Sequence, residues 1–170
     1  MIAALSSARP KIADYPFTTL VPNLGVVRKP TGDGTVFADI PGLIEGAHQG
    51  LGLGHEFLRH TERTRLLLHL IDATAADPVA NYRMIQSELR AYSSTLAQRP
   101  QLVALNKIDA LPEDELEAIA ADVETECQQE VLRLSAVTQA GTDGLLQRIW
   151  KILDQSEPAS ASVFYTPAAP

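Results

Sequence analysis

Hydrophobic residues in this chain occur either as short continuous runs or at helical spacing. Residues 66–72 (LLLHLID) and 102–106 (LVALN) are nearly continuous in apolar residues, which is typical of parallel strands covered on both faces. Three other stretches have the features of helices: residues 79–96, 112–126 and 144–153. Residues 130–136 (EVLRLSA) indicate one more short strand. Strands that alternate with helices predict an α/β fold with a mostly parallel sheet.

The first third of the chain predicts a β-hairpin. Residues 24–29 and 35–39 have the composition of its strands, and residues 31–34 supply the turn. Residues 1–8 have the spacing of a helix end, and residues 55–64 that of a further helix.

Composition bounds the number of domains and the class of protein. With 170 residues, 45% of them hydrophobic, residues 1–155 are expected to form one domain with a single core, and residues 156–170 a linker or disordered tail rich in Pro, Ala and Ser. The net charge of −7 argues against broad attraction to nucleic acid or anionic lipid. No apolar run reaches membrane-spanning length and Cys127 is the only cysteine, so we expect a cytoplasmic protein without membrane insertion.

The apolar run at 102–106 ends on Asn106, Lys107, Ile108 and Asp109, the order in which several nucleotide-binding proteins read guanine. The Asp109 carboxylate can accept both the ring N–H and the exocyclic amine of guanine, a donor pair that adenine lacks, while Lys107 can lay its aliphatic stem along the base or ribose. Such a site rejects an analogue by roughly 10⁴-fold or more. The alternative is a surface turn that caps a helix. Three fixed residues match by chance in a chain of this length about one time in fifty, which favours guanine.

Ser135, Ala136 and Val137 end the next predicted strand, where backbone N–H groups can donate to the guanine oxygen. A helix cap is the alternative for this common dipeptide, so the motif gains weight only from its place one βα unit after NKID. His69, inside LLLHLID, is expected to be a satisfied core or sheet-edge histidine.

Two further motifs have the chemistry of a magnesium and phosphate site. Asp39 in DIPG can hold Mg²⁺ through its waters, and Gly42 lets the backbone N–H approach a terminal phosphate. A hydroxyl of Thr18 or Thr19 can ligate Mg²⁺ once a phosphate orders the loop. Chance is the alternative for DIPG, and a pair of β-branched residues in an extended segment is the alternative for the threonines. Both motifs therefore count only together with the others.

Taken together, DYPFTTLVPNLGVV, FADIPGLIEGAHQGLGLGHEFLRHTERTRLLLHLID, NKID and SAV closely resemble the GTPase domain of the Obg family, also called CgtA. The resemblance covers residues 1 to about 154, and its most specific parts are residues 14–27 and 37–72. It implies a Ras-like, three-layer α/β fold and hydrolysis of GTP to GDP and phosphate with Mg²⁺. It also implies a ribosomal role, because the family's bacterial GTPases take part in late assembly of the large subunit and are linked to the stringent response.

The resemblance implies a nucleotide site spread over four segments. The first switch would be formed by Phe17, Thr18, Thr19, Leu20 and Val21, and the second-switch signature by Asp39, Ile40, Pro41 and Gly42. The base would be read by Asn106, Lys107, Ile108, Asp109, Ser135, Ala136 and Val137. Thr19 and Asp39 would be the magnesium ligands. No catalytic residue is assigned, because Leu43 stands where many small GTPases place a glutamine that orients the attacking water.

In the family, a strand and a loop of the pattern G-x-x-x-x-G-K-[ST] run into the helix whose remainder matches residues 1–8. That loop carries most of the binding to the β- and γ-phosphates, so we expect phosphate binding and hydrolysis to be impaired in this chain alone. The same strand lies centrally in the family's sheet, between the strands predicted at 35–39 and 66–71. We therefore expect a Ras-like sheet that lacks its first central strand, in a chain that either closes the gap by direct pairing or is poorly soluble.

The sequence thus predicts an Obg-type GTP-binding protein, with GTP and GDP as ligands and the ribosomal large subunit as partner. The alternative is a noncatalytic module that uses the base site and the switches to bind guanine nucleotide, the ribosome or another protein. A third possibility is an inert gene fragment or a misplaced start codon.

Overall fold

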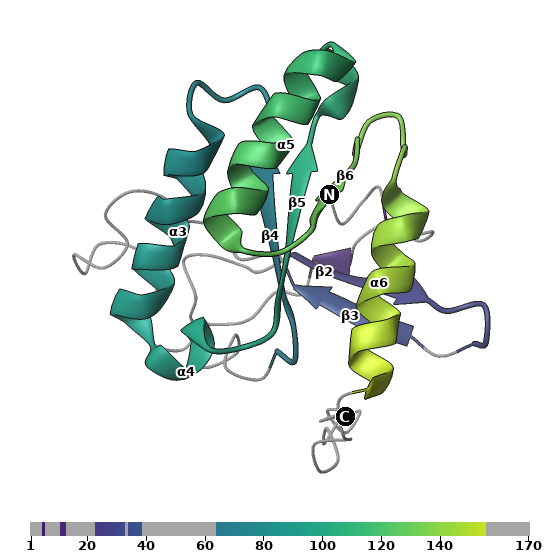
Figure 1. The fold of residues 1–170 in the computed structure, drawn as a ribbon. Helices are drawn as coiled ribbons and strands as arrows, with labels where there is room; N and C mark the ends of the chain where they lie inside the picture. The colour runs from purple at the N-terminus through teal and green to yellow at the C-terminus, as the bar shows by residue number, and fades with distance from the viewer. Residues whose placement is uncertain (1–4, 6–10, 13–22, 33, 39–63, 156–170) are drawn as a thin grey trace, which may run out of the picture.

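The computed structural model describes residue 5 and residues 11–12, 23–32, 34–38 and 64–155 (Figure 1). Four predicted segments lie wholly or mostly outside these residues: the switches at 17–21 and 39–42, the helix at 55–64 and the tail at 156–170. Of the helix end predicted at 1–8, Leu5 is described and is helical. Within the described ranges, no helix is both long and apolar enough to cross a membrane.

The predicted hairpin is present and belongs to an antiparallel sheet. This sheet contains β1 (Lys11–Ile12), β2 (Asn23–Arg28) and β3 (Gly34–Ala38), in that order. β2 and β3 each begin one residue earlier than predicted. The Gly32 N–H donates to the Lys29 carbonyl at 2.9 Å, and Gly32 has a φ of +100°, which glycine adopts without a steric penalty.

The second sheet is parallel and has its most buried strand in the centre. It contains β4 (Leu67–Asp72), β5 (Gln101–Asn106) and β6 (Val131–Arg133), in that order. All side chains from Leu102 to Leu105 are buried, which confirms the prediction made from the apolar run. Asp72 pairs with Asn106 in the β4–β5 register, so the two strands end side by side. The residues that follow them therefore lie at the same edge of the sheet.

Helices cover both faces of the parallel sheet (Figure 1). α3 (Pro78–Tyr92), α4 (Ser94–Ala97) and α5 (Glu113–Cys127) lie on one face, and α6 (Thr142–Gln155) lies on the other.

The single helix predicted at 79–96 is divided into α3 and α4, because Ser93 has an extended backbone. Its Oγ accepts a hydrogen bond from the Leu96 N–H, which caps the start of α4.

The two faces of β5 contribute to two separate cores. Val103 and Leu105 lie in the core that includes Leu116 of α5, whereas Leu102 and Ala104 lie in the core that includes α6. This alternation follows from the two-residue period of a strand. Packing against α5 on one face and α6 on the other fixes the position and the register of β5 in the sheet.

The described residues show no direct pairing between β3 and β4, so of the two expected outcomes direct closure of the gap is wrong, and poor solubility stays a prediction. The two sheets instead share an apolar core. Val27 and Phe37 of the hairpin lie in the same cluster as Leu68 and Leu70 of β4, together with residues of α6. Burial of apolar side chains is non-directional, so it holds the two sheets against one helix without a common hydrogen-bond ladder.

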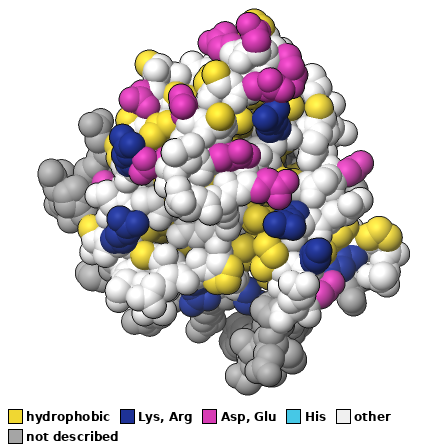
Figure 2. Space-filling view, in the orientation of Figure 1, with side chains coloured by type: hydrophobic (Ala, Val, Ile, Leu, Met, Phe, Trp, Pro, Cys, Tyr) yellow, Lys and Arg dark blue, Asp and Glu magenta, His cyan; other side chains and the backbone are white. Residues whose placement is uncertain are grey.

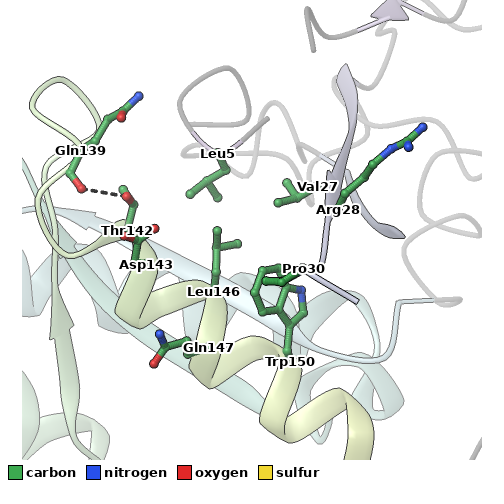
Figure 3. A pocket seen from close by; sticks show the side chains of 10 residues that line it. All are labelled: Leu5, Val27, Arg28, Pro30, Gln139, Thr142, Asp143, Leu146, Gln147 and Trp150. Carbon is green, nitrogen blue, oxygen red and sulfur yellow. Dashed lines mark hydrogen bonds between the residues drawn. The ribbon is translucent and has the colours of Figure 1, made fainter. Parts of the chain in front are cut away.

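Leu5 lies between the hairpin and α6 (Figure 3). Its side chain is buried in the same cluster as Val27. A cavity of about 420 Å³ remains beside it, and Trp150 of α6 forms part of the wall. The Trp150 indole N–H donates to Thr35 Oγ1 at 3.2 Å, which ties α6 to β3.

His69 lies in the middle of β4, and its ring stacks on Tyr82 of α3 with the ring centroids 5.2 Å apart. Its Nδ1 is buried and has no hydrogen-bond partner within the described structure. The expected satisfied histidine is therefore wrong for this atom. Burial lowers the pKa of His69 to about 4.

The free energy of unfolding should decrease in mild acid because of His69. Its folded pKa of about 4 lies below its ordinary 6.5, so the unfolded chain binds the proton first as the pH falls. Stability that is present above pH 6.5 is therefore lost towards pH 4, and at pH 5 this group alone costs about 2 kcal/mol. Urea unfolding at pH 7 and at pH 5 measures this change. The free energy of unfolding should fall between the two pH values by about 2 kcal/mol less in His69→Phe than in the wild type. Equal losses in the two proteins would contradict the assignment.

Candidate functional site

The residues predicted to read a base meet at the carboxyl edge of the parallel sheet. Asn106 is the last residue of β5, and its Oδ1 accepts a 3.0 Å hydrogen bond from the Ala136 N–H in the loop after β6. The Leu134 N–H donates to the Leu105 carbonyl at 2.9 Å, which extends the β5–β6 contact up to this loop. The structure therefore brings the NKID and SAV segments into direct contact.

The side chains of NKID have four different surroundings. Asn106 contacts the SAV loop, as described, and the Lys107 ammonium lies 2.6 Å from Asp72 Oδ2. Ile108 packs against the core that β5 shares with α5. Asp109 is exposed and has no hydrogen bond or ion pair within the described residues. Its carboxylate is thus available to accept hydrogen bonds from a ligand.

The turn after β5 depends on the backbone of Lys107. This residue has φ 68° and ψ 32°, in the left-handed region, and it leads into the short 3₁₀ helix η2 (Ile108–Ala110). The Ala110 N–H closes the turn on the Lys107 carbonyl at 3.0 Å. This left-handed conformation costs a residue with a side chain about 1 kcal/mol more than it costs glycine. Strain of this kind is concentrated at binding sites, and at Lys107 it coincides with a side chain held by an ion pair.

Two of the three N–H donors predicted in the SAV loop are engaged inside the protein. The Ser135 N–H donates to the Ala140 carbonyl at 2.9 Å, and the Ala136 N–H donates to Asn106 Oδ1 at the end of β5. Val137 is 84% exposed, and its N–H has no partner in the part of the chain that is described. The Ser135 Oγ accepts from the Thr138 N–H at 3.0 Å, so it stabilises this loop and does not cap α6.

Asp72, which sequence analysis did not select, is a further polar residue at this edge. Its Oδ1 accepts hydrogen bonds from the Thr74 N–H at 2.9 Å and the Thr74 hydroxyl at 2.7 Å, while Oδ2 binds Lys107. The hydrogen bond from Lys107 holds the pKa of Asp72 below its ordinary value, with Thr74 adding to the shift and partial burial opposing it. The signal in the sequence was a carboxylate at the end of LLLHLID, followed two residues later by a threonine.

Gly141 allows the SAV loop to return closely along β6 before α6 begins. It has a φ of +74°, and a Cβ at this position would lie 2.1 Å from the Arg133 carbonyl oxygen. The Gly141 carbonyl also accepts a hydrogen bond from the Leu145 N–H, at the start of α6. No other residue type fits both the dihedral angle and the space.

The predicted magnesium ligands, Thr19 and Asp39, lie outside the described residues, as do the other predicted switch residues. Among the residues that are described, no three His, Cys, Asp or Glu side chains come together to hold a metal. The cavity of Figure 3 lies between β2 and α6, so it does not include the NKID segment.

Charge is unevenly distributed around this edge. Every charged residue of α5 is Asp or Glu. Figure 2 shows acidic side chains gathered at the top of the molecule, where α5 lies, and most Lys and Arg side chains of this view below it. An acidic face repels phosphate groups, so α5 is unsuited to contact a nucleic-acid backbone.

The conformation of Gly141 can be tested by adding one methyl group. Gly141→Ala should lower the free energy of unfolding by about 2 kcal/mol or more, because the new Cβ meets the β6 backbone and the positive φ becomes strained. Gly144→Ala is the matched control: nothing lies within 4 Å of its Cβ, and alanine favours the helix by about 0.5–1 kcal/mol. Urea unfolding measures both. A Gly141→Ala protein as stable as the wild type would show that the close approach is absent.

Comparisons with known proteins show the family of this chain. The sequence profile of a family described as 50S ribosome-binding GTPase matches residues 1–107. The GTPase Obg of Crocosphaera subtropica is 67% identical over 156 residues, which are 92% of this chain and 46% of that protein. The GTPase Obg of a Synechocystis species is 63% identical over 161 residues, 95% of this chain and 44% of that protein. The chain thus spans about half the length of the curated relatives it matches.

Solved structures with the same fold have much lower sequence identity. The G domain of the FeoB iron transporter from T. maritima superposes with a TM-score of 0.62 at 18% identity, covering 89% of this chain and 88% of that chain. The cytosolic domain of the same transporter in its GMPPNP form gives 0.61 at 17% identity, covering 92% of this chain and 58% of that chain. These matches confirm the predicted fold class, an α/β fold with a parallel sheet, similar to the G domains of P-loop GTPases.

Proposed function

Because the chain belongs to the family of 50S ribosome-binding GTPases and its relatives are Obg proteins, we propose that its sheet edge reads the guanine base of GTP and GDP. The observation that carries this proposal is the hydrogen bond from the Ala136 N–H to Asn106 Oδ1, which sets the NKID and SAV segments side by side. Hydrolysis of GTP to GDP and phosphate is the proposed activity of the whole protein.

Guanine would be recognised through its pattern of donors and acceptors. The Asp109 carboxylate, exposed and without a described partner, would accept from the ring N–H and the exocyclic amine. The SAV loop would donate to the guanine oxygen, and its open donor is the Val137 N–H. Adenine has an amine in place of that oxygen and lacks the donor pair. With adenine bound, polar groups of the site would have no hydrogen-bond partner, and this loss of binding free energy discriminates adenine from guanine.

Asn106 and Lys107 would support the base without supplying the discriminating hydrogen bonds. The side chain of Asn106 holds the SAV loop at a fixed distance from η2, and Lys107 can cover one face of the ring with its aliphatic stem. Ile108 anchors the turn in the core. Ser135, fully buried, anchors the loop on the other side.

The proposed cofactor is Mg²⁺, and its proposed ligands Thr19 and Asp39 rest on the sequence. The other proposed contacts of the switches are Phe17, Thr18, Leu20, Val21, Ile40, Pro41 and Gly42. When bound, the ion would neutralise charge on the nucleotide's phosphates. The chain's own contribution there would be a hydroxyl from one switch and a carboxylate from the other.

The proposed partner is the ribosomal large subunit, which the family's description supports, and the proposed compartment is the cytoplasm, where ribosomes act. The acidic α5 would face away from ribosomal RNA in such a complex. We propose residues 1–155 as the GTPase domain and residues 156–170 as a linker or disordered tail. The relatives are named GTPases, which favours this function over a noncatalytic binding module.

Asp109→Asn should exchange the base preference of the site. The new amide nitrogen would donate a hydrogen bond to the carbonyl of xanthine, whereas guanine has an amine, also a donor, at the same position. Affinity for GDP should therefore fall by about 100-fold or more, and affinity for XDP should rise. Calorimetric titration of the wild type and the variant with GDP, XDP and ADP measures this. Asp122→Asn, which neutralises an exposed carboxylate of α5, should leave all three affinities unchanged. Equal affinity of the wild type for GDP and ADP would refute the proposed function.

A further inference from the structure

We propose that Asp72 is a positioning residue of the base site: its carboxylate holds the Lys107 ammonium so that the lysine stem forms a wall on which the guanine ring packs. This inference rests on the guanine-reading function proposed above. Asp72 acts through Lys107, so its own atoms need no contact with the nucleotide.

The direction of the Lys107 stem follows from the strand register. Lys107 comes directly after β5, and its ammonium lies 2.6 Å from Asp72 Oδ2 at the end of β4. The stem therefore crosses from the end of β5 towards β4. The SAV loop follows β6, on the opposite side of β5. A ring above the end of β5 would thus lie between the lysine stem and the SAV loop.

Asp72 is itself held in place before any ligand binds. Its Oδ1 accepts both the N–H and the hydroxyl of Thr74, at 2.9 and 2.7 Å, which leaves Oδ2 directed to the lysine. The backbone next to it is fixed as well, since the Ala73 N–H donates to the Asn106 carbonyl at 3.0 Å. A long, flexible side chain anchored in this way has less freedom to lose when a base packs on it, and binding is correspondingly tighter.

Stability alone does not explain this arrangement. The side chains of Lys107 and Asp72 are 53% and 38% exposed, and ion pairs with such exposure contribute little to folding. The left-handed backbone of Lys107 would be more favourable with glycine in its place. A lysine at this strained position, paired with a carboxylate that is already fixed, is consistent with a role for its side chain in binding.

The test is a guanosine titration of the 170-residue chain, followed by saturation-transfer NMR, which detects weak affinities. Asp72→Asn should weaken guanosine binding by about three- to tenfold, because the lysine stem regains its freedom. Glu126→Gln is the matched control: it removes an equally short and exposed ion pair, Arg83–Glu126 at 2.6 Å, outside the base site. Its guanosine affinity should equal that of the wild type.

A positioning role is separated from a structural one by a double-mutant cycle. Lys107→Met keeps an apolar stem and removes the ammonium, so adding Asp72→Asn to it should have no further effect on guanosine affinity. Additive losses in the double variant, or equal affinities of Asp72→Asn and the wild type, would overturn the inference while leaving the guanine-reading function intact. A wild type that does not distinguish guanosine from adenosine would overturn both.

Discussion

The parallel register of β4, β5 and β6 is the constraint on which the rest of the structure depends. It places Asp72 beside Asn106, and the contact of β5 with β6 continues from Leu134 to Leu105. A shift of one residue in β5 would exchange its side chains between the two cores, so no alternative register preserves the packing of both. Because the core fixes the register, it also fixes where three loops begin.

All three loops have a buried anchor, and the loops after β5 and β6 combine it with a residue that is open to a ligand. After β4, Ala73 is almost fully buried, and Lys107 reaches across to the carboxylate before it. After β5, Ile108 packs in the core and Asp109 is exposed. After β6, Ser135 is fully buried and Val137 is exposed. The anchors transmit the rigidity of the core to the edge, which is what a preorganised binding site needs.

Local patterns in the sequence predicted the parts of this structure that depend on short-range physics. The apolar run of β5 and the hairpin follow from neighbouring residues, and the structure contains both of them. The pairing of Asp72 with Lys107 was not predicted, because it joins residues 35 positions apart whose proximity depends on strand register. The unpaired Nδ1 of His69 and the engaged N–H groups of the SAV loop also depend on tertiary contacts.

The failure to predict how β3 and β4 are related has the same origin. Direct closure was one of two expected outcomes, because unpaired strand edges are unfavourable, but side-chain burial against α6 joins the two sheets without a ladder between them. The Ser93 break in the long helix is likewise a competition that sequence spacing does not resolve, because a side-chain cap for α4 replaces the continuing helix.

The central claim is that one hydrogen bond, from the Ala136 N–H to Asn106, assembles two loops into a site that distinguishes guanine from adenine. Amide ¹H–¹⁵N spectra of the chain during addition of guanosine and of adenosine test it most directly. The account predicts that guanosine shifts the amide signals of Asp109, Ala136 and Val137 before any others and that adenosine leaves them in place. Equal shifts with both nucleosides, or shifts confined to other parts of the chain, would contradict it.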